Sequence, residues 1–207
     1  MQLFDRFFVF LHQNHRSVKV FLSEDIWQFD LRTAMEDISP QRREQALKFK
    51  HELGQRLCVL AYLLLKQGLR EEYGIMDNPV FEYNEHGKPS IVGHPEVFFN
   101  ISHCREAVIC VVSSRPVGVD VESYRSFSDS LIHYTMNDTE ITQIQSAEDP
   151  RAAFIRLWTM KEATLKLSGH GISNDMRHVI DDDKISYTTV EKDKYVYTVC
   201  EEKVSIK

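Results

Sequence analysis

The sequence lacks the features that mark secreted, membrane-spanning and nucleic-acid-binding proteins. Its four cysteines show no CxxC spacing and no disulfide-framework density, so a reducing cytoplasm is the expected compartment. The longest apolar run, Leu57–Leu65, is far too short to span a bilayer. The formal net charge of −6 gives no bulk attraction to nucleic acid or to anionic membranes.

Targeting signals and linkers are also missing from the sequence pattern. The segment Met1–Leu11 is rich in phenylalanine, but it has neither a basic n-region nor a small-residue cleavage site. No low-complexity stretch divides the 207 residues, which suffice for one large domain or two small ones. We therefore expect a cytoplasmic protein without nucleic-acid or membrane partners.

Strand-like and helical patterns recur in a similar order along the chain. The strand-like segments are 7–11, 18–22, 80–83, 97–100, 107–112, 117–122, 185–190 and 195–200. One long, buried helix is expected to end at Gly68, and a second, opened by Asp149-Pro150, is expected to end at Gly169. Although no residue-level repeat accompanies this order, it predicts an α+β fold of two similar halves in a pseudo-two-fold arrangement, residues 1–105 and 106–207.

One short strand carries two carboxylates, although acidic residues are depleted in strands. In the segment 117–122, valines alternate with Gly118, Asp120 and Glu122, so the valines bury one face and both carboxylates share the other. With the segment 107–112 this pattern predicts a hairpin, in which Gly118 clears space beside the acids. The acids need a cation nearby, which is a metal ion or an Arg or Lys side chain, unless the strand is a solvated edge.

Two further stretches concentrate polar side chains. Glu162 and Lys166 lie on one face of a predicted helix, where by themselves they would form only a surface ion pair. Phe98–His103 is a strand end that leads into a loop. Its Ser102 is not a catalytic nucleophile, because adjacent Ser and His rarely form that geometry and no nucleophile elbow surrounds it. His103 is an anion contact or a structural histidine.

At these stretches the sequence resembles the 4′-phosphopantetheinyl transferases of the larger, surfactin-synthetase-activating type. The matching motifs, in chain order, are Gly87-Lys88-Pro89, Phe99–His103, Gly118–Glu122, and Trp158–Ala163 with Lys166 and the turn Gly169-His170-Gly171. Each motif alone is weak, but four in this order and approximate spacing are specific. The resemblance covers about Val18 to Gly171 and is vague across the C-terminal strands.

The resemblance implies transfer of phosphopantetheine from coenzyme A to a serine of an acyl or peptidyl carrier protein, with release of 3′,5′-adenosine bisphosphate. It also implies that Asp120, Glu122 and Glu162 hold Mg²⁺ together with a pyrophosphate oxygen. The chemistry agrees, because a hard cation prefers carboxylates, phosphate and water. Glu162 is expected to receive the serine proton, directly or through a water, and Lys166 to offset charge on the pyrophosphate.

The same resemblance assigns contacts with coenzyme A. It places Lys88, Ser102 and His103 against the co-substrate, with Lys88 and His103 on phosphates. The best matches for the 3′-phosphate pocket are Arg42, Arg43 and Arg56. The pattern departs at Gln45 and at Leu57-Cys58, where a basic residue and a small hydroxyl residue would be expected. Alternatively, Arg42 and Arg43 belong to a solvated helix start, and Arg56 forms a structural ion pair.

The carrier protein is expected to dock near the metal, between the halves. The segment Tyr124–Met136 is either a lip of that docking surface or an ordinary connector. Because the chain and its expected carriers are both acidic, gross charge steering is not expected. One chain carries the motifs of both halves, so we expect a monomer. Two alternatives stay open: a Mg²⁺-dependent hydrolase of nucleotide pyrophosphates, and a non-catalytic paralogue that binds coenzyme A or a carrier protein.

Overall fold

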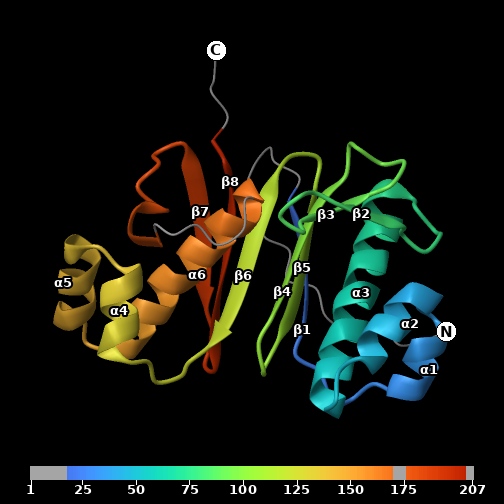
Figure 1. The fold of residues 1–207 in the computed structure, drawn as a ribbon, viewed down its shortest axis with the longest axis horizontal. Helices are drawn as coiled ribbons and strands as arrows, with labels where there is room; N and C mark the ends of the chain where they lie inside the picture. Colours follow the sequence, from blue (N-terminus) through green and yellow to red (C-terminus); the bar gives the residue numbers. More distant parts are fainter. Residues whose placement is uncertain (1–17, 170–175, 204–207) are drawn as a thin grey trace.

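A computed structural model describes residues 18–169 and 176–203, and its elements form four layers (Figure 1). The first sheet contains β1 (Lys19–Ser23), β4 (Phe98–His103) and β5 (Val108–Ser113). The second sheet contains β6 (Val117–Ser123), β7 (Ile185–Glu191) and β8 (Tyr195–Glu202). The long helix α3 (Glu52–Tyr73) covers the outer face of the first sheet, and α6 (Pro150–Ser168) covers that of the second (Figure 1).

Each half follows the same order of a strand, a long helix and two closing strands. Both sheets are antiparallel, and in both the last strand of the half lies in the middle, which gives the orders β1-β5-β4 and β6-β8-β7. The predicted α+β fold with two similar halves is therefore confirmed. Because β5 pairs with β1 and β4, it belongs to the first sheet. The two sheets are therefore divided between Ser113, the end of β5, and Val117, the start of β6, which lies after the boundary expected between residues 105 and 106.

The predicted hairpin between segments 107–112 and 117–122 is wrong. β5 is hydrogen-bonded on both sides within the first sheet, whereas β6 pairs with β8. Every residue of β5 is buried, so both of its edges and both of its faces need protein partners. The valine face of β6 meets it by packing and not by pairing, since Val119 and Val121 share one buried cluster with Ile109. The prediction that these valines bury one face is confirmed.

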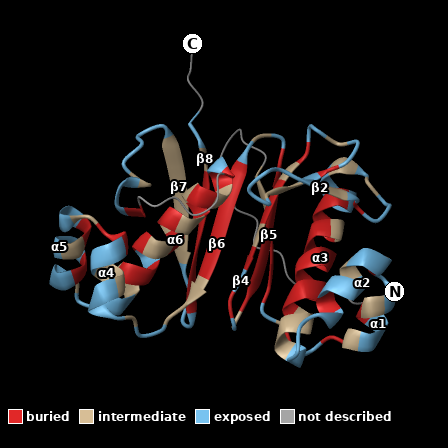
Figure 2. Cartoon of the chain, in the orientation of Figure 1, coloured by how far each residue is buried: buried red, intermediate tan, exposed pale blue. Residues whose placement is uncertain are grey.

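Buried side chains line the two sheets and the inner sides of α3 and α6 (Figure 2). One cluster lies between α3 and the first sheet, a second between the two sheets, and smaller ones between α6 and the second sheet. The shorter helices are mostly exposed in this view. They are α1 (Leu31–Glu36), α2 (Pro40–Leu47), α4 (Asp129–Thr135) and α5 (Asp138–Ser146).

The prediction that the first long helix ends at Gly68 is wrong, because α3 continues to Tyr73. The residue in the left-handed conformation is Gly74, with φ 67°, and its N–H donates to the Arg70 carbonyl. Gly68 has another role, since a Cβ there would lie 2.9 Å from the ring of Phe21 and 3.0 Å from Val112 Cγ1. This glycine lets the helix approach the sheet closely and does not end it.

The other predicted helix signals are confirmed. Asp149 caps α6 by accepting hydrogen bonds from the next two free N–H groups, and Gly169, with φ 68°, ends the helix. Asn137 and Glu140 form the predicted capping box of α5. A small hairpin of β2 (Phe81–Tyr83) and β3 (Pro89–Ile91) and the short helix η1 (Met176–His178) complete the elements.

Some expectations concern residues outside the described ranges. The strand expected at 7–11 is one, and His170-Gly171 of the glycine turn is another. Within the described residues, no helix has the length and apolar character needed to cross a bilayer.

Candidate active site

The two sheets meet at their edge strands β4 and β6, which are joined through side chains. The Val119 N–H donates to Asn100 Oδ1 over 3.4 Å, and the Ser102 hydroxyl donates to Asp120 Oδ1 over 2.8 Å. On the outer side of β6, a Cβ at Gly118 would collide with the Ala163 carbonyl oxygen of α6. The space that this glycine clears is therefore filled by α6, which lies directly on the strand that carries the acids.

Asp120 is the centre of this contact and is only 4% exposed. Its Oδ1 accepts hydrogen bonds from Ser102 and, over 2.6 Å, from Lys166 Nζ on α6. Lys166 Nζ also donates to the Ser102 hydroxyl over 2.8 Å. The other oxygen, Oδ2, is buried and has no hydrogen-bond partner in the part of the chain that the structure describes. A buried carboxylate oxygen without a donor is costly, which favours a bound cation at this position.

Glu122 and Glu162 lie in the same negatively charged surroundings. The Trp158 indole N–H donates to Glu122 Oε1 over 3.2 Å, and Arg125 Nη2 lies 3.6 Å from Glu122 Oε2. Burial, followed by the charge of Asp120, raises the pKa of Glu122. The same two causes, in the same order, raise the pKa of Glu162. Each carboxylate disfavours ionisation of its neighbours, an effect that a bound cation would reverse.

These three carboxylates fit a divalent cation that also binds substrate and water. Within residues 18–169 and 176–203, no group of three or more His, Cys, Asp or Glu side chains is already arranged to hold a metal ion. Mg²⁺ commonly uses one or two carboxylates and completes its coordination with phosphate oxygens and water. The partnerless Oδ2 of Asp120 is the type of ligand that such an ion uses. The residues therefore fit Mg²⁺ with part of its coordination left to a phosphate-bearing substrate.

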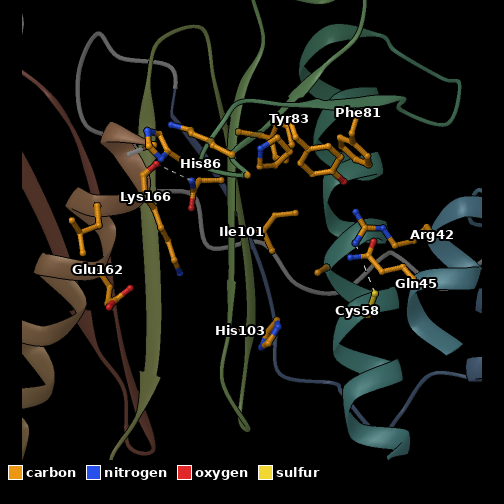
Figure 3. Close-up of a pocket in the computed structure, with 18 of the residues that line it drawn as sticks. Arg42, Gln45, Cys58, Phe81, Tyr83, His86, Ile101, His103, Glu162 and Lys166 are labelled. Carbon is orange, nitrogen blue, oxygen red and sulfur yellow. Dashed lines mark hydrogen bonds between the residues drawn. The ribbon is translucent and has the colours of Figure 1, made fainter. Parts of the chain in front are cut away.

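A pocket of about 530 Å³ leads from these acids across to the first half of the chain. Figure 3 shows Glu162 and Lys166 on α6 at one side, His103 in the middle, and Arg42 at the opposite side. The residues of the predicted site that line it are Arg42, Lys88, His103, Glu162 and Lys166. The structure thus brings residues from both halves into one cavity.

The hairpin of β2 and β3 closes the pocket against the end of α6. Lys88 Nζ donates to the Leu167 carbonyl over 2.8 Å, and the Asn84 side chain donates to the Gly169 carbonyl over 3.1 Å. Burial lowers the pKa of Lys88. Burial, followed by the nearby charge of Lys166, lowers the pKa of His103. His103 is therefore a neutral imidazole near pH 7, able to donate one hydrogen bond to a phosphate but carrying no charge.

Comparison with known proteins agrees with this geometry. Residues 116–204 match the family model of the 4′-phosphopantetheinyl transferase superfamily. The chain is 29% identical over 157 residues to 4′-phosphopantetheinyl transferase Sfp of Bacillus subtilis (strain 168), which covers 74% of this chain and 70% of that protein. It is 32% identical over 139 residues to 4′-phosphopantetheinyl transferase psf-1 of Bacillus pumilus, which covers 66% of this chain and 60% of the relative. Over its second half the chain matches the 4′-phosphopantetheinyl transferase superfamily, and over most of its length it is similar to these two relatives.

These matches confirm the resemblance inferred from the four motifs. A third relative, 4′-phosphopantetheinyl transferase gsp of Aneurinibacillus migulanus, is 29% identical over 139 residues, which cover 66% of this chain and 58% of the relative. The aligned part of the chain spans 70%, 60% and 58% of the lengths of these three relatives.

Three residues expected to contact the co-substrate lie outside the pocket lining. Arg43 Nε donates to the Met35 carbonyl over 2.7 Å, on the outside of α2. Arg56 Nη2 lies 2.7 Å from Glu52 Oε1, and its guanidinium also donates to the Phe29 carbonyl over 2.9 Å. Ser102 lies between Asp120 and Lys166 and does not line the cavity. Of the three arginines predicted for the 3′-phosphate pocket, Arg42 alone is part of the lining.

One residue of the fourth motif, Lys161, has a role that the sequence motif did not indicate. Lys161 is fully buried, and its Nζ lies 2.9 Å from Glu140 Oε1. The same ammonium donates to the carbonyls of Met176 and Arg177 over 2.9 and 3.0 Å. A lysine on the buried side of a predicted helix, one residue before Glu162, is the signal that could have revealed it. It ties η1 and α5 to the helix that carries Glu162 and Lys166.

Proposed function

We propose that this protein transfers the 4′-phosphopantetheine group of coenzyme A to a serine of an acyl or peptidyl carrier protein, in a Mg²⁺-dependent reaction that releases 3′,5′-adenosine bisphosphate. One observation carries the proposal: a single pocket is lined by Glu162 and Lys166, whose ammonium contacts Asp120, and also by Arg42, Lys88 and His103. Relatives named as 4′-phosphopantetheinyl transferases support the reaction type.

Glu162 has the surroundings of a proton acceptor for the carrier serine. The serine oxygen forms a bond to the β-phosphorus while the bond from that phosphorus to the bridging pyrophosphate oxygen breaks, and adenosine bisphosphate leaves with the electron pair. The serine proton passes to the Glu162 carboxylate. Glu162 lines the pocket together with Lys166, so its carboxylate faces the space in which the acceptor serine and the pyrophosphate would meet.

Asp120, Glu122 and Glu162 would hold Mg²⁺, which supplies neutralisation of charge on the pyrophosphate. The partnerless Oδ2 of Asp120 supports this assignment. Lys166 reaches both the pocket and Asp120 Oδ1, so its ammonium can offset negative charge on the leaving group as that charge develops. Ser102 keeps Lys166 and Asp120 in register by contacting both side chains.

The remainder of the co-substrate would follow the pocket toward the first half. Lys88 and His103 also line this pocket, so both can donate to phosphate oxygens. Arg42 lies at the far end, on α2. Because one chain lines both sides of the cavity, the proposed active form is a monomer. The four cysteines are free and buried, which supports the cytoplasm as the proposed compartment.

The intact mass of a purified apo acyl carrier protein, incubated with this protein, coenzyme A and Mg²⁺, tests the proposal. We expect a gain of one phosphopantetheine that is lost with a chelator and with a carrier whose acceptor serine is replaced by alanine. Phosphate release from coenzyme A without any carrier would instead identify a hydrolase. No gain across several fatty-acid and peptide carriers, with coenzyme A still bound, would identify a non-catalytic binding protein.

A further inference from the structure

The two ends of the pocket differ in chemistry (Figure 3). The end at α6 contains the carboxylate of Glu162 and the ammonium of Lys166. The opposite end, which we call the aromatic recess, is lined among the described residues by neutral and aromatic side chains around one guanidinium: Arg42, Gln45, Phe49, Cys58, Phe81 and Tyr83. A ligand that fills the pocket therefore meets charges at one end and mostly ring faces at the other.

Arg42 is held in the aromatic recess by rings. Its guanidinium carbon lies 5.1 Å from the ring centroid of Tyr62 and 5.5 Å from that of Phe81, within the range of cation–π contacts. Its Nη1 lies 3.8 Å from Cys58 Sγ. Within the described residues no carboxylate forms an ion pair with Arg42. Arg42 is thus a positive charge on a mainly apolar surface, with no carboxylate partner among the described residues.

Such a surface suits a nucleobase better than a phosphate group. Bases stack on aromatic rings and on guanidinium planes, and the Phe81 and Phe99 rings, with centroids 5.8 Å apart, continue the wall from Arg42 toward β4. A phosphate monoester carries a charge of about −1.5 to −2 near neutral pH and is held most firmly by several donors or cations at once. The residues beside Arg42 are Gln45 and Cys58, which are neutral.

We infer that the aromatic recess binds the adenine base of the co-substrate by stacking and that its 3′-phosphate contacts Arg42 alone, so that this protein uses 3′-dephospho-coenzyme A almost as well as coenzyme A. The inference rests on the proposed function, since it specifies the range of nucleotides that the same site accepts. In this proposal most recognition occurs at the pyrophosphate, which both nucleotides share. The 3′-phosphate adds one ionic contact, with the half-exposed side chain of Arg42.

The test compares kcat/KM for coenzyme A and for 3′-dephospho-coenzyme A in the carrier mass assay. One contact with a partly exposed cation predicts a preference for coenzyme A of no more than about tenfold. A preference above about a hundredfold would overturn the inference while leaving the proposed function in place. Transfer from neither nucleotide would overturn the proposed function itself, so the two failures are distinguishable.

Two variants localise the preference. Arg42→Ala should abolish the remaining preference for coenzyme A, because the ratio of the two kcat/KM values isolates the contact with the 3′-phosphate from the loss of stacking. Activity with 3′-dephospho-coenzyme A shows that the variant is folded. The matched control is Lys48→Ala, which removes an exposed cation paired with Glu44 at the end of the same helix and should leave the ratio unchanged. A preference that survives in Arg42→Ala would overturn the assignment.

The opposite change should create discrimination. Gln45→Lys adds a second cation next to Arg42 at an exposed position on α2, where a lysine needs no repacking. We expect the ratio of kcat/KM for coenzyme A to kcat/KM for 3′-dephospho-coenzyme A to rise by about tenfold. An unchanged ratio in this variant would contradict a 3′-phosphate position beside Arg42.

Discussion

In each half a glycine lets the long helix approach a strand closely, but the glycine lies on the helix in the first half and on the strand in the second. In the first half the glycine is Gly68 of α3, and the ring of Phe21 on β1 lies against it. In the second half the glycine is Gly118 of β6, and the backbone of α6 at Ala163 lies against it. The glycine therefore faces side-chain atoms in the first half and mainly backbone atoms in the second half.

This difference decides which half can carry charge. The helix-facing side of β1 is filled by Phe21, which joins the apolar cluster beneath α3. On β6 the glycine brings the α6 backbone close, so that Lys166 reaches Asp120 on the same side of the strand. The first half thus serves as an apolar frame and pocket wall, while the second half holds the groups proposed to act on the pyrophosphate.

The largest expected effect contrasts Asp120 with Phe21. Asp120→Ala should reduce transfer by at least about a thousandfold, because it removes a proposed metal ligand and the partner of Lys166. Its free energy of unfolding should change by less than about 2 kcal/mol, since the lost carboxylate includes an oxygen without a hydrogen bond. Phe21→Ala should instead destabilise the fold by about 3–5 kcal/mol.

Carrier mass kinetics and chemical denaturation of both variants check this contrast. Full activity in Asp120→Ala would refute the metal assignment. Strong unfolding of that variant would show that Asp120 belongs to the frame and not to the chemistry.

The next contrast concerns the two glycines. A methyl group at Gly118 would meet the Ala163 carbonyl oxygen and the Leu167 N–H, which are backbone atoms that cannot move without shifting α6. Gly118→Ala should therefore destabilise the protein by about 3 kcal/mol or more. At Gly68 the methyl group meets side-chain atoms of Phe21 and Val112, which can adjust, and alanine favours the helix by about 1 kcal/mol.

Gly68→Ala should consequently cost less than about 2 kcal/mol. Urea denaturation of the two variants measures the difference directly. Equal costs would mean that the two helix–strand contacts are equally rigid, contrary to the comparison of the halves.

The capping signals at the starts of helices predicted local structure correctly. The capping box at Asn137 and the cap at Asp149 each depend on residues within one helical turn, so their outcome is decided without the rest of the fold. The pairing of β6 is not local, because its partner β8 follows only after α6 and β7. A short connector made a hairpin with β5 the simplest prediction, yet packing across the two sheets determined the outcome.

The candidate site shows the same difference between what the sequence indicates and what only the fold reveals. Asp120, Glu162 and Lys166 could be found because their residue types and order form a motif, and the structure brings them to one place. Arg56 could not be separated from Arg42 by sequence, since only the fold shows that Glu52 and main-chain carbonyls engage it. The aromatic recess had no motif, because its rings come from the segment after α2 and from the β2 strand, which are distant in the chain.

A smaller effect on turnover is expected from lysines of the two long helices. Lys166→Ala should slow transfer by about a hundredfold, since it removes the cation that contacts Asp120 and faces the pocket. The matched variant in the first half is Lys66→Ala, whose exposed ammonium donates to the Asp37 carbonyl and lies away from the pocket. That variant should transfer at the unchanged rate. An unchanged transfer rate in Lys166→Ala as well would mean that the contact between Lys166 and Asp120 is only a surface ion pair.

The smallest effect concerns Lys88, which joins the two halves through the Leu167 carbonyl. Burial lowers the pKa of Lys88, so its ammonium is present below that pKa and is lost at a lower pH than for an exposed lysine. The KM for coenzyme A should therefore rise by up to about tenfold as the pH is raised through this lowered pKa. Lys88→Arg stays protonated in that range, so its KM should stay flat. Parallel KM profiles from neutral to alkaline pH would show that Lys88 binds the helix end and no phosphate, which would leave His103 and Arg42 to line the first-half side of the substrate path.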